Sequence, residues 1–231
     1  FVLPTDLTQT PDSLGLRILE ACRFLNANPA EIRNWIISSV VPAANPILRK
    51  AARRFCRGAK ILFVPEDLPL PLENQYARPN EVGSDRLVTA YAARALYPDA
   101  CSLIVVDFGT ATTFDCVKRN AYLGGLICPG VLSSARALSG QTAKLPQISL
   151  DLDSEELQIG KSTSQSLNQG FVFGFAAMIE GVIARLTKQL DGEILVVGTG
   201  GFAEPLSRVT HALDEIRPDL LLQGLLLARD L

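Results

Sequence analysis

Short runs of consecutive apolar, largely β-branched residues recur along the chain, and turn-forming or helical segments separate them. Such runs are typical of strands that are buried on both faces of a sheet. They predict strands at residues 35–41, 61–64, 103–106, 112–118, 123–127 and 194–197. Apolar residues at helical spacing predict helices at residues 14–24, 45–56, 85–97, 133–139, 163–190 and from 218 onward. This order predicts an α/β fold of two units, residues 1–99 and 100–231.

Residues before the first predicted helix indicate where it begins, and the net charge of the chain excludes some classes of protein. Ser13 or Asp12 is the expected N-cap of this helix. The chain has 22 Lys and Arg residues and 24 Asp and Glu residues, so its net charge is −2. A chain with this charge lacks the positive electrostatic field that binds nucleic acid phosphates. The uncharged stretches fall short of the ~20 apolar residues of a spanning helix, and the first residues do not resemble a signal peptide. We therefore expect a cytoplasmic globular protein that binds neither nucleic acid nor membranes.

The reactive side chains exclude two further classes. The five cysteines are odd in number and form no C-x-x-C pair, which argues against a disulfide framework and a tetrahedral zinc site. His211 is the single histidine and no G-x-S-x-G sequence accompanies it, which argues against a hydrolase triad.

Two glycine-containing turns follow predicted strands. Asp107 follows strand 103–106 and precedes Gly109 and Thr110, whose N–H and hydroxyl groups suit a phosphate, while the Asp107 carboxylate suits a cation. A plain β-hairpin with Asp107 as a local hydrogen-bond acceptor explains the same residues. The second turn, Gly-Thr-Gly-Gly at residues 198–201, lets a flat nucleoside approach the backbone. It fits a tight strand–helix turn equally well.

A third candidate opens the predicted helix 85–97, at the sequence Gly83-Ser84-Asp85-Arg86. Free N–H groups and the helix dipole favour an anion at such a position. Asp85 is then a general base and Arg86 an anion clamp. The alternative is an Asp that only caps the helix, next to an Arg on the surface.

The segment Gly160-Lys161-Ser162-Thr163 resembles the end of a phosphate-binding P-loop. Glu155 stands where the first glycine of that motif belongs, so we exclude a P-loop. Two interpretations stay open for these residues: a cap for the following helix, or a contact to a substrate hydroxyl.

Several short motifs follow one another in a fixed order along nearly the whole chain. They are Tyr76-x-x-Pro79-x-x-Val82-Gly83-Ser84-Asp85-Arg86, Asp107-Phe108-Gly109-Thr110-Ala111-Thr112-Thr113-Phe114-Asp115, Gly124-Gly125, Pro129-Gly130-Val131, Thr142-Ala143-Lys144-Leu145-Pro146, Gly160-Lys161-Ser162-Thr163, Glu180-Gly181 and Gly198-Thr199-Gly200-Gly201. Together, in order and spacing, they resemble the type III pantothenate kinases.

The resemblance implies a fold of the superfamily of acetate and sugar kinases, heat-shock ATPases and actin. Two ribonuclease-H-like domains would surround a central cleft, and the first would lack its N-terminal hairpin in this chain. The implied reaction is phosphorylation of pantothenate by ATP to 4'-phosphopantothenate, the first step of coenzyme A biosynthesis. The resemblance also implies a homodimer, a monovalent cation (K⁺ or NH₄⁺) and Mg²⁺ with the ATP.

Matched position by position, the resemblance assigns roles to individual residues. Asp85 corresponds to the proton acceptor and Asp107 to the cation ligand. The implied pantothenate site comprises Tyr76, Gly83, Ser84, Arg86 and Thr163. The implied ATP contacts are Gly109, Thr110, Gly198, Gly200 and Gly201. An Asp with an ordinary pKa is a weak base at neutral pH, so we expect Asp85 to act more by orienting the hydroxyl than by basicity.

One family motif, D-x-G-N-T, which grips the ATP phosphates, does not occur in the sequence. Because residue 1 is not Met, we expect this motif to precede it. The alternative is a non-catalytic, regulatory member of the family that serves as a transcription accessory factor. A third hypothesis is an actin-like nucleotide-binding protein, which would need no small-substrate pocket; the block at residues 76–86 argues against it.

The predicted helix from Thr163 is apolar on more than one face, and its large apolar residues are Phe171, Phe173, Phe175, Met178 and Ile179. A helix that is apolar all round has to be buried. We therefore expect a two-fold dimer that uses this helix, with Thr163 near the partner's pocket. The alternative is a helix that is fully buried within one subunit.

Overall fold

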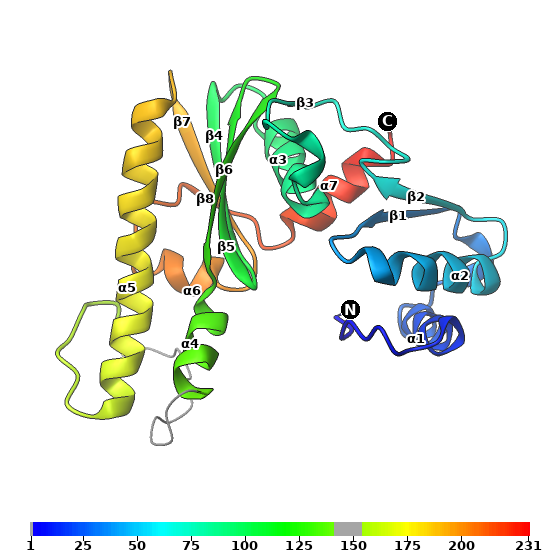
Figure 1. Ribbon diagram of the computed structural model, residues 1–231, viewed down its shortest axis with the longest axis horizontal. Helices are drawn as coiled ribbons and strands as arrows, with labels where there is room; N and C mark the ends of the chain where they lie inside the picture. The colour runs from blue at the N-terminus through cyan, green and yellow to red at the C-terminus, as the bar shows by residue number, and fades with distance from the viewer. Residues whose placement is uncertain (1, 141–153) are drawn as a thin grey trace. The chain divides into compact units, whose positions relative to one another are not determined.

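The computed structural model describes residues 2–140 and 154–231, and its contacts divide the chain into two compact units (Figure 1). Unit 1 comprises Phe1–Pro71, Asn80–Val88 and Leu221–Leu231, and unit 2 comprises Leu72–Pro79 and Thr89–Leu220. Both units combine separated stretches of chain, so no single boundary divides them. The division at residues 99 and 100, which the order of predicted elements suggested, stays a prediction. The motif at residues 142–146 lies outside the described residues.

Unit 1 is built around a parallel strand pair. β1 (Asn34–Ser38) and β2 (Lys60–Val64) are joined through α2 (Asn45–Phe55), which packs against α1 (Pro11–Phe24). The first residues of α3 (Ser84–Leu96) and most of α7 (Leu220–Ala228) also belong to this unit. The expected cap of α1 was wrong: Thr10 is the N-cap, because its side chain accepts a hydrogen bond from Ser13 N at 3.2 Å.

Unit 2 contains a six-stranded mixed sheet in the order β3-β6-β5-β4-β7-β8. Its strands are β3 (Glu73–Asn74), β4 (Ser102–Phe108), β5 (Ala111–Lys118), β6 (Ala121–Pro129), β7 (Ile194–Thr199) and β8 (Glu215–Ile216). β4, β5 and β6 form an antiparallel meander, whereas β3, β7 and β8 join by parallel pairing. Parallel pairing brings the carboxyl ends of β4 and β7 to the same edge of the sheet.

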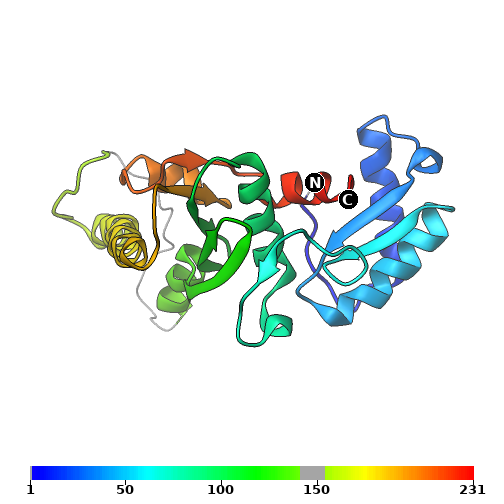
Figure 2. The ribbon, with the colours of Figure 1, turned by 90° about the horizontal axis from the view of Figure 1, so that it is seen from above.

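Helices cover both faces of this sheet (Figure 2). The helices of unit 2 are α4 (Val131–Gly140), α5 (Thr163–Leu186), α6 (Ala203–Ser207) and the part of α3 from residue 89. Short 3₁₀ turns, η1 (Pro29–Glu31), η2 (Pro42–Ala44), η3 (Pro79–Glu81) and η4 (Thr187–Gln189), complete the described chain. Ile104 and Phe114 pack with Ile179 of α5 in the core of unit 2. Because side chains alternate along a strand, Asp107 and Asp115 lie on the other face.

The predicted α/β class is confirmed, and each predicted strand and helix has a counterpart in the structure. β1 ends earlier than predicted, at Ser38, because its partner strand β2 ends at Val64, opposite Ser38. Sequence patterns missed β3 and β8, which have only two residues each, and α6, which has five. Elements this short carry no readable periodicity.

Candidate active site

The two predicted phosphate-binding turns lie side by side at one edge of the unit 2 sheet. Asp107 at the end of β4 stands opposite Thr199 at the end of β7. Gly200 has a φ of +87°, and a Cβ built on it would lie 2.6 Å from Asp107 Oδ1 and 2.8 Å from the Phe108 carbonyl oxygen. Glycine is therefore required by both conformation and space. The two oxygens converge on the space that the missing side chain leaves.

The start of α4 supports the turn that contains Gly109 and Thr110. Ser133 Oγ donates a hydrogen bond to the Thr110 carbonyl oxygen at 2.7 Å. A Cβ on Gly130 would approach the same oxygen to 2.3 Å, so the backbone of α4 begins in direct contact with the turn. Sequence reasoning placed Gly130 only in a matching motif and did not single out Ser133. A glycine between a strand and a helix was the available signal.

This edge offers groups for a phosphate and for a cation. Gly109, Thr110 and Gly201 are exposed, and Asp107 is half-buried. Among residues 2–140 and 154–231, no group of three or more His, Cys, Asp or Glu could hold a metal ion. A cation at Asp107 would therefore complete its shell with backbone carbonyl, phosphate or water oxygens. Such a shell suits a hard cation and not a transition metal.

Asp85 is the second residue of α3, so it lies in the first helical turn and is not the N-cap. Its Oδ1 accepts a hydrogen bond from Arg86 N at 2.8 Å. A Cβ on Gly83 would lie 2.4 Å from the same oxygen, which shows that the carboxylate folds over the Gly83 backbone. The glycine thus gives the half-buried carboxylate its place at the helix start.

The neighbours of Asp85 are buried. The Ser84 hydroxyl lies 2.9 Å from Ser38 Oγ and donates to the Ser39 carbonyl oxygen at 3.1 Å, which ties the start of α3 to the end of β1. Arg86 is only 8% exposed, which contradicts the alternative of a surface arginine. The Ser84 side chain therefore faces the interior of unit 1.

Tyr76 lies in unit 2 beside β6. Its backbone N–H donates to Asn74 Oδ1 at 3.0 Å, and its ring is tilted at 44° to Tyr122, with centroids 6.4 Å apart. A Cβ on Gly124, whose φ is +115°, would approach the Tyr76 ring to 3.1 Å. Gly124 in turn lines a cavity of about 440 Å³ together with Val182 from the far part of α5.

Thr163 is exposed at the first turn of α5, where the Ser162 side chain is the N-cap. From residue 163 to residue 182 an α-helix rises about 28 Å. Thr163 therefore stands at the opposite end of α5 from Val182, which lines the cavity together with Gly124. The structure does not bring Thr163 and Tyr76 together within one chain.

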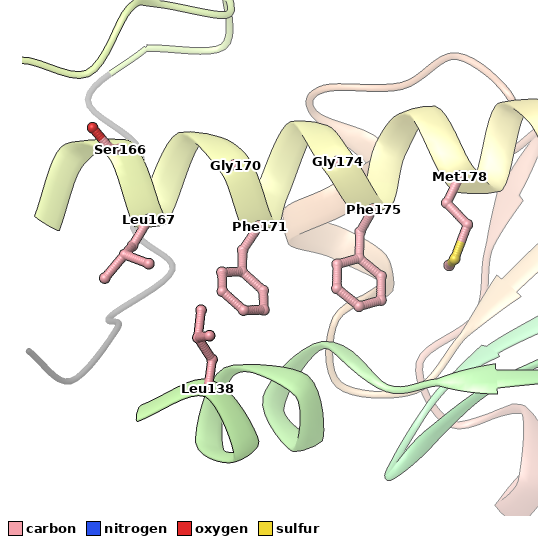
Figure 3. Close-up of a pocket in the computed structure, with 8 residues that line it drawn as sticks. All are labelled: Leu138, Ser166, Leu167, Gly170, Phe171, Gly174, Phe175 and Met178. Atoms are coloured by element: carbon pink, nitrogen blue, oxygen red, sulfur yellow. The ribbon is translucent and has the colours of Figure 1, made fainter. Parts of the chain in front are cut away.

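An apolar groove runs between α4 and the first half of α5 (Figure 3). Leu138 of α4 points toward Phe171 and Phe175 of α5, and the cavity has a volume of about 400 Å³. The rings of Phe171 and Phe175 stack with centroids 6.3 Å apart. Cβ atoms on Gly170 and Gly174 would meet nothing within 4 Å, so the helix backbone is open on this side.

The helix Thr163–Gln189 is long and apolar enough to cross a membrane, a possibility that the sequence analysis had discounted. This is weak evidence, because core helices of globular proteins pass the same test. Only 22% of its most apolar window is buried in the described chain, which contradicts the alternative of a helix fully buried within one subunit.

Comparison with known proteins gives one consistent family. The family model for type III pantothenate kinase matches residues 1–185. A type III pantothenate kinase of Nitratidesulfovibrio vulgaris (strain Miyazaki F) is 60% identical over 225 residues, 97% of this chain and 86% of the relative. Those of Oleidesulfovibrio alaskensis and Lawsonia intracellularis are 54% and 46% identical, each over 97% of this chain and over 85% and 84% of the relative.

Solved structures agree at the level of the fold. A Campylobacter jejuni protein described as a Baf family transcriptional activator matches with a TM-score of 0.57 at 19% identity, covering 91% of this chain and 87% of that one. The ethanolamine utilization protein EutJ of Carboxydothermus hydrogenoformans matches with a TM-score of 0.51 at 12% identity, covering 95% and 74%.

Proposed function

The chain belongs to the type III pantothenate kinase family, which phosphorylates pantothenate with ATP in the first step of coenzyme A biosynthesis, and from this premise we propose which residues divide the work. ATP, accompanied by Mg²⁺, and pantothenate are the substrates. The observation that carries the proposal is the convergence of Asp107, the Phe108 carbonyl and Gly200 at one edge of the sheet.

Asp107 and the Phe108 carbonyl oxygen hold a monovalent cation, K⁺ or NH₄⁺, which offsets negative charge on the phosphates. The N–H groups of Gly109, Thr110 and the turn at residues 198–201 contact ATP. Phosphoryl transfer depends mainly on positioning and on electrostatic stabilisation of the phosphate oxygens, which such donors provide. Two observations support this assignment. Residue 200 has to be glycine, and Ser133 donates a hydrogen bond to the Thr110 carbonyl oxygen.

Asp85 accepts the proton of the pantothenate hydroxyl. The hydroxyl oxygen attacks the γ-phosphorus of ATP, and ADP departs. The carboxylate is half-buried and held at the helix start, which favours orientation of the hydroxyl over simple basicity. Tyr76, Gly83, Arg86 and Thr163 contribute to the pantothenate site. Ser84 contributes through its backbone, because its hydroxyl is bonded to β1.

Two copies of the chain form a dimer through α5. The half-buried Phe171, Phe175 and Met178 and the open backbone at Gly170 and Gly174 lie on one side of this helix. A two-fold axis across that side makes the two α5 helices antiparallel. Thr163 of the partner subunit then approaches the end of α5 that carries Val182, which lines a cavity together with Gly124. This arrangement accounts for the distance between Thr163 and Tyr76 within one chain.

The finer features of the resemblance belong to the same proposal. The protein has two ribonuclease-H-like domains. It works in the cytoplasm and binds neither nucleic acid nor a membrane.

Pantothenate-dependent release of ADP from ATP by the complete protein is the direct test. We expect turnover that needs pantothenate and rises with K⁺. ADP release that is independent of pantothenate would support an actin-like ATPase, and nucleotide binding without turnover would support the regulatory alternative.

A further inference from the structure

A buried polar pair lies behind Tyr76 on the face of the unit 2 sheet opposite α5. Asp115 of β5 and Tyr122 of β6 are each 0% exposed. Tyr122 Oη donates to Asp115 Oδ1 at 2.8 Å, and Thr113 Oγ1 donates to Asp115 Oδ2 at 3.1 Å. A carboxylate survives burial only when it is well hydrogen-bonded, and a phenol that donates to an ionised acceptor is strongly held. The Tyr122 ring therefore has one fixed orientation.

The local sheet geometry explains how the phenol reaches this carboxylate. Gly125 stands opposite Asp115 on β6, so β6 places no side chain there. The register shifts between Cys116 and Val117, which leaves Tyr122 opposite Val117 on the same face as Asp115. A β-bulge of this kind re-aims a side chain within a regular ladder.

Tyr76 rests on this fixed ring. The two rings lie at centroid and tilt values typical of a favourable aromatic pair, 6.4 Å and 44°. Gln75 N donates to the Tyr122 carbonyl oxygen at 2.9 Å, and Gly124 has no Cβ to push the Tyr76 ring away. Tyr122 therefore positions both the backbone before Tyr76 and the Tyr76 ring.

We propose that Asp115 and Tyr122 are positioning residues for Tyr76 and thereby set the affinity of the enzyme for pantothenate, and not for ATP. The inference rests on the proposed place of Tyr76 in the pantothenate site. The carboxylate fixes the phenol, the phenol fixes the ring, and the ring supports the side chain that meets the substrate.

The test compares steady-state kinetics of four variants of the complete protein: Tyr122→Phe, Tyr76→Ala, their double variant and Ile104→Val. Tyr122→Phe keeps the ring and removes the hydrogen bond, so we expect the pantothenate KM to rise about three- to tenfold, with kcat and the ATP KM within about twofold. Tyr76→Ala raises the same KM. In the Tyr76→Ala background, Tyr122→Phe adds nothing further, because its effect passes through Tyr76.

The control is Ile104→Val, which trims a fully buried side chain on the opposite face of the same sheet. It lowers the melting temperature and leaves the pantothenate KM unchanged. Asp115→Asn retains an amide oxygen for the phenol, so its pantothenate KM lies between those of the parent and Tyr122→Phe. If Tyr122→Phe does not fold, Asp115→Asn takes its place and is expected to raise the pantothenate KM and not the ATP KM.

Each unexpected result of these measurements contradicts a particular step of the proposal. If Tyr76→Ala raises the pantothenate KM and Tyr122→Phe does not, the positioning role is wrong and the site of Tyr76 stands. If Tyr76→Ala leaves that KM unchanged, both the placement of Tyr76 and the inference are wrong. If Tyr122→Phe changes both KM values in parallel or adds fully to Tyr76→Ala, the pair serves only stability.

Discussion

Asp85 can serve the helix or the reaction, and the two roles respond differently to one substitution. In Asp85→Asn the loss of a first-turn charge costs about 0.3–1 kcal/mol of stability. If the carboxylate accepts the substrate proton, turnover falls by ~10²–10⁴-fold in the same variant. Melting temperature and pantothenate phosphorylation, measured on the same preparations, separate the two roles.

Asp12 provides a matched control, because it is the second residue of α1 as Asp85 is of α3. Asp12→Asn also loses an exposed ion pair with Arg54, so its stability cost is similar or slightly larger. Its turnover stays at the parental level. A folded Asp85→Asn enzyme with turnover within a few-fold of the parent would leave Asp85 as a helix residue only.

Asp107 is expected to be the charged ligand of the monovalent cation. Asp107→Asn removes the charge and leaves the Phe108 carbonyl and Gly200 in place. We expect the K⁺ concentration for half-maximal activity to rise at least about tenfold, which corresponds to ~1.4 kcal/mol of binding. Activity titrated with KCl at constant ionic strength measures this. Asp191→Asn, at an exposed aspartate paired with Lys118, is the control and keeps the parental K⁺ dependence.

The sequence could indicate Asp85, Asp107 and Gly200, because their backbone positions follow from a strand end or a helix start. It could not indicate that the Ser84 hydroxyl faces β1 or that Asp115 bonds to Tyr122. Those contacts depend on which strands pair and in which register. Short motifs do not encode that information.

At the scale of elements, Asp67 fixes the turn that follows β2. Its Oδ2 accepts hydrogen bonds from Phe63 N at 2.9 Å and from Arg49 Nη2 at 3.0 Å. These contacts, the Phe63 backbone first and the Arg49 side chain next, lower the pKa of the Asp67 carboxyl below its ordinary 3.8. The ionised carboxylate therefore stabilises the fold above that ordinary pKa. This contribution is lost as the pH falls through the lower pKa of the folded state.

We expect Asp67→Asn to destabilise the protein at pH 7 by at most about 1 kcal/mol, because the carboxylate is partly exposed and screened. The deficit relative to the parent shrinks as the pH falls through the lowered pKa. Thermal unfolding between pH 7 and pH 2 measures it. Glu66→Gln, at the neighbouring exposed carboxylate, should show no such pH-dependent deficit; an equal deficit would assign the effect to net charge.

The sequence predicted the boundaries of elements where particular side chains mark the start of a helix, and not elsewhere. α2 begins at Asn45, as predicted, and α3 within one residue of its predicted start. The N-cap of α1 was misplaced because Thr10, Asp12 and Ser13 are all good caps in sequence, and only the hydrogen bond from Ser13 N selects Thr10. β3 and β8 exist through pairing with β6 and β7, so their cause lies outside their own residues.

At the scale of the whole molecule, α5 has more apolar surface than the described residues of one chain cover. Val172, Ala176, Ile179 and Ile183 are buried in the core, and the adjoining Phe171, Phe175 and Met178 pack against that core but stay partly exposed. The sequence predicted apolar residues on several faces but not which face the chain itself would cover. A standard protein interface buries about 800 Å² on each partner, and a helix of this length, about 36 Å, can provide much of it.

The dimer prediction follows from the part of this apolar surface that stays exposed. The parent, a chain of 24.9 kDa, should sediment as a dimer at micromolar concentration. Phe175→Glu places a charge in the apolar groove, where an unpaired buried charge is costly, so it should sediment as a monomer. Ala184→Glu adds the same charge at an exposed position outside the groove residues and should remain a dimer. Because we propose that Thr163 contributes to the partner's pantothenate site, the monomer should also lose pantothenate affinity. A Phe175→Glu variant that stays dimeric would place the interface elsewhere, and a dissociated variant with unchanged pantothenate affinity would separate Thr163 from the substrate.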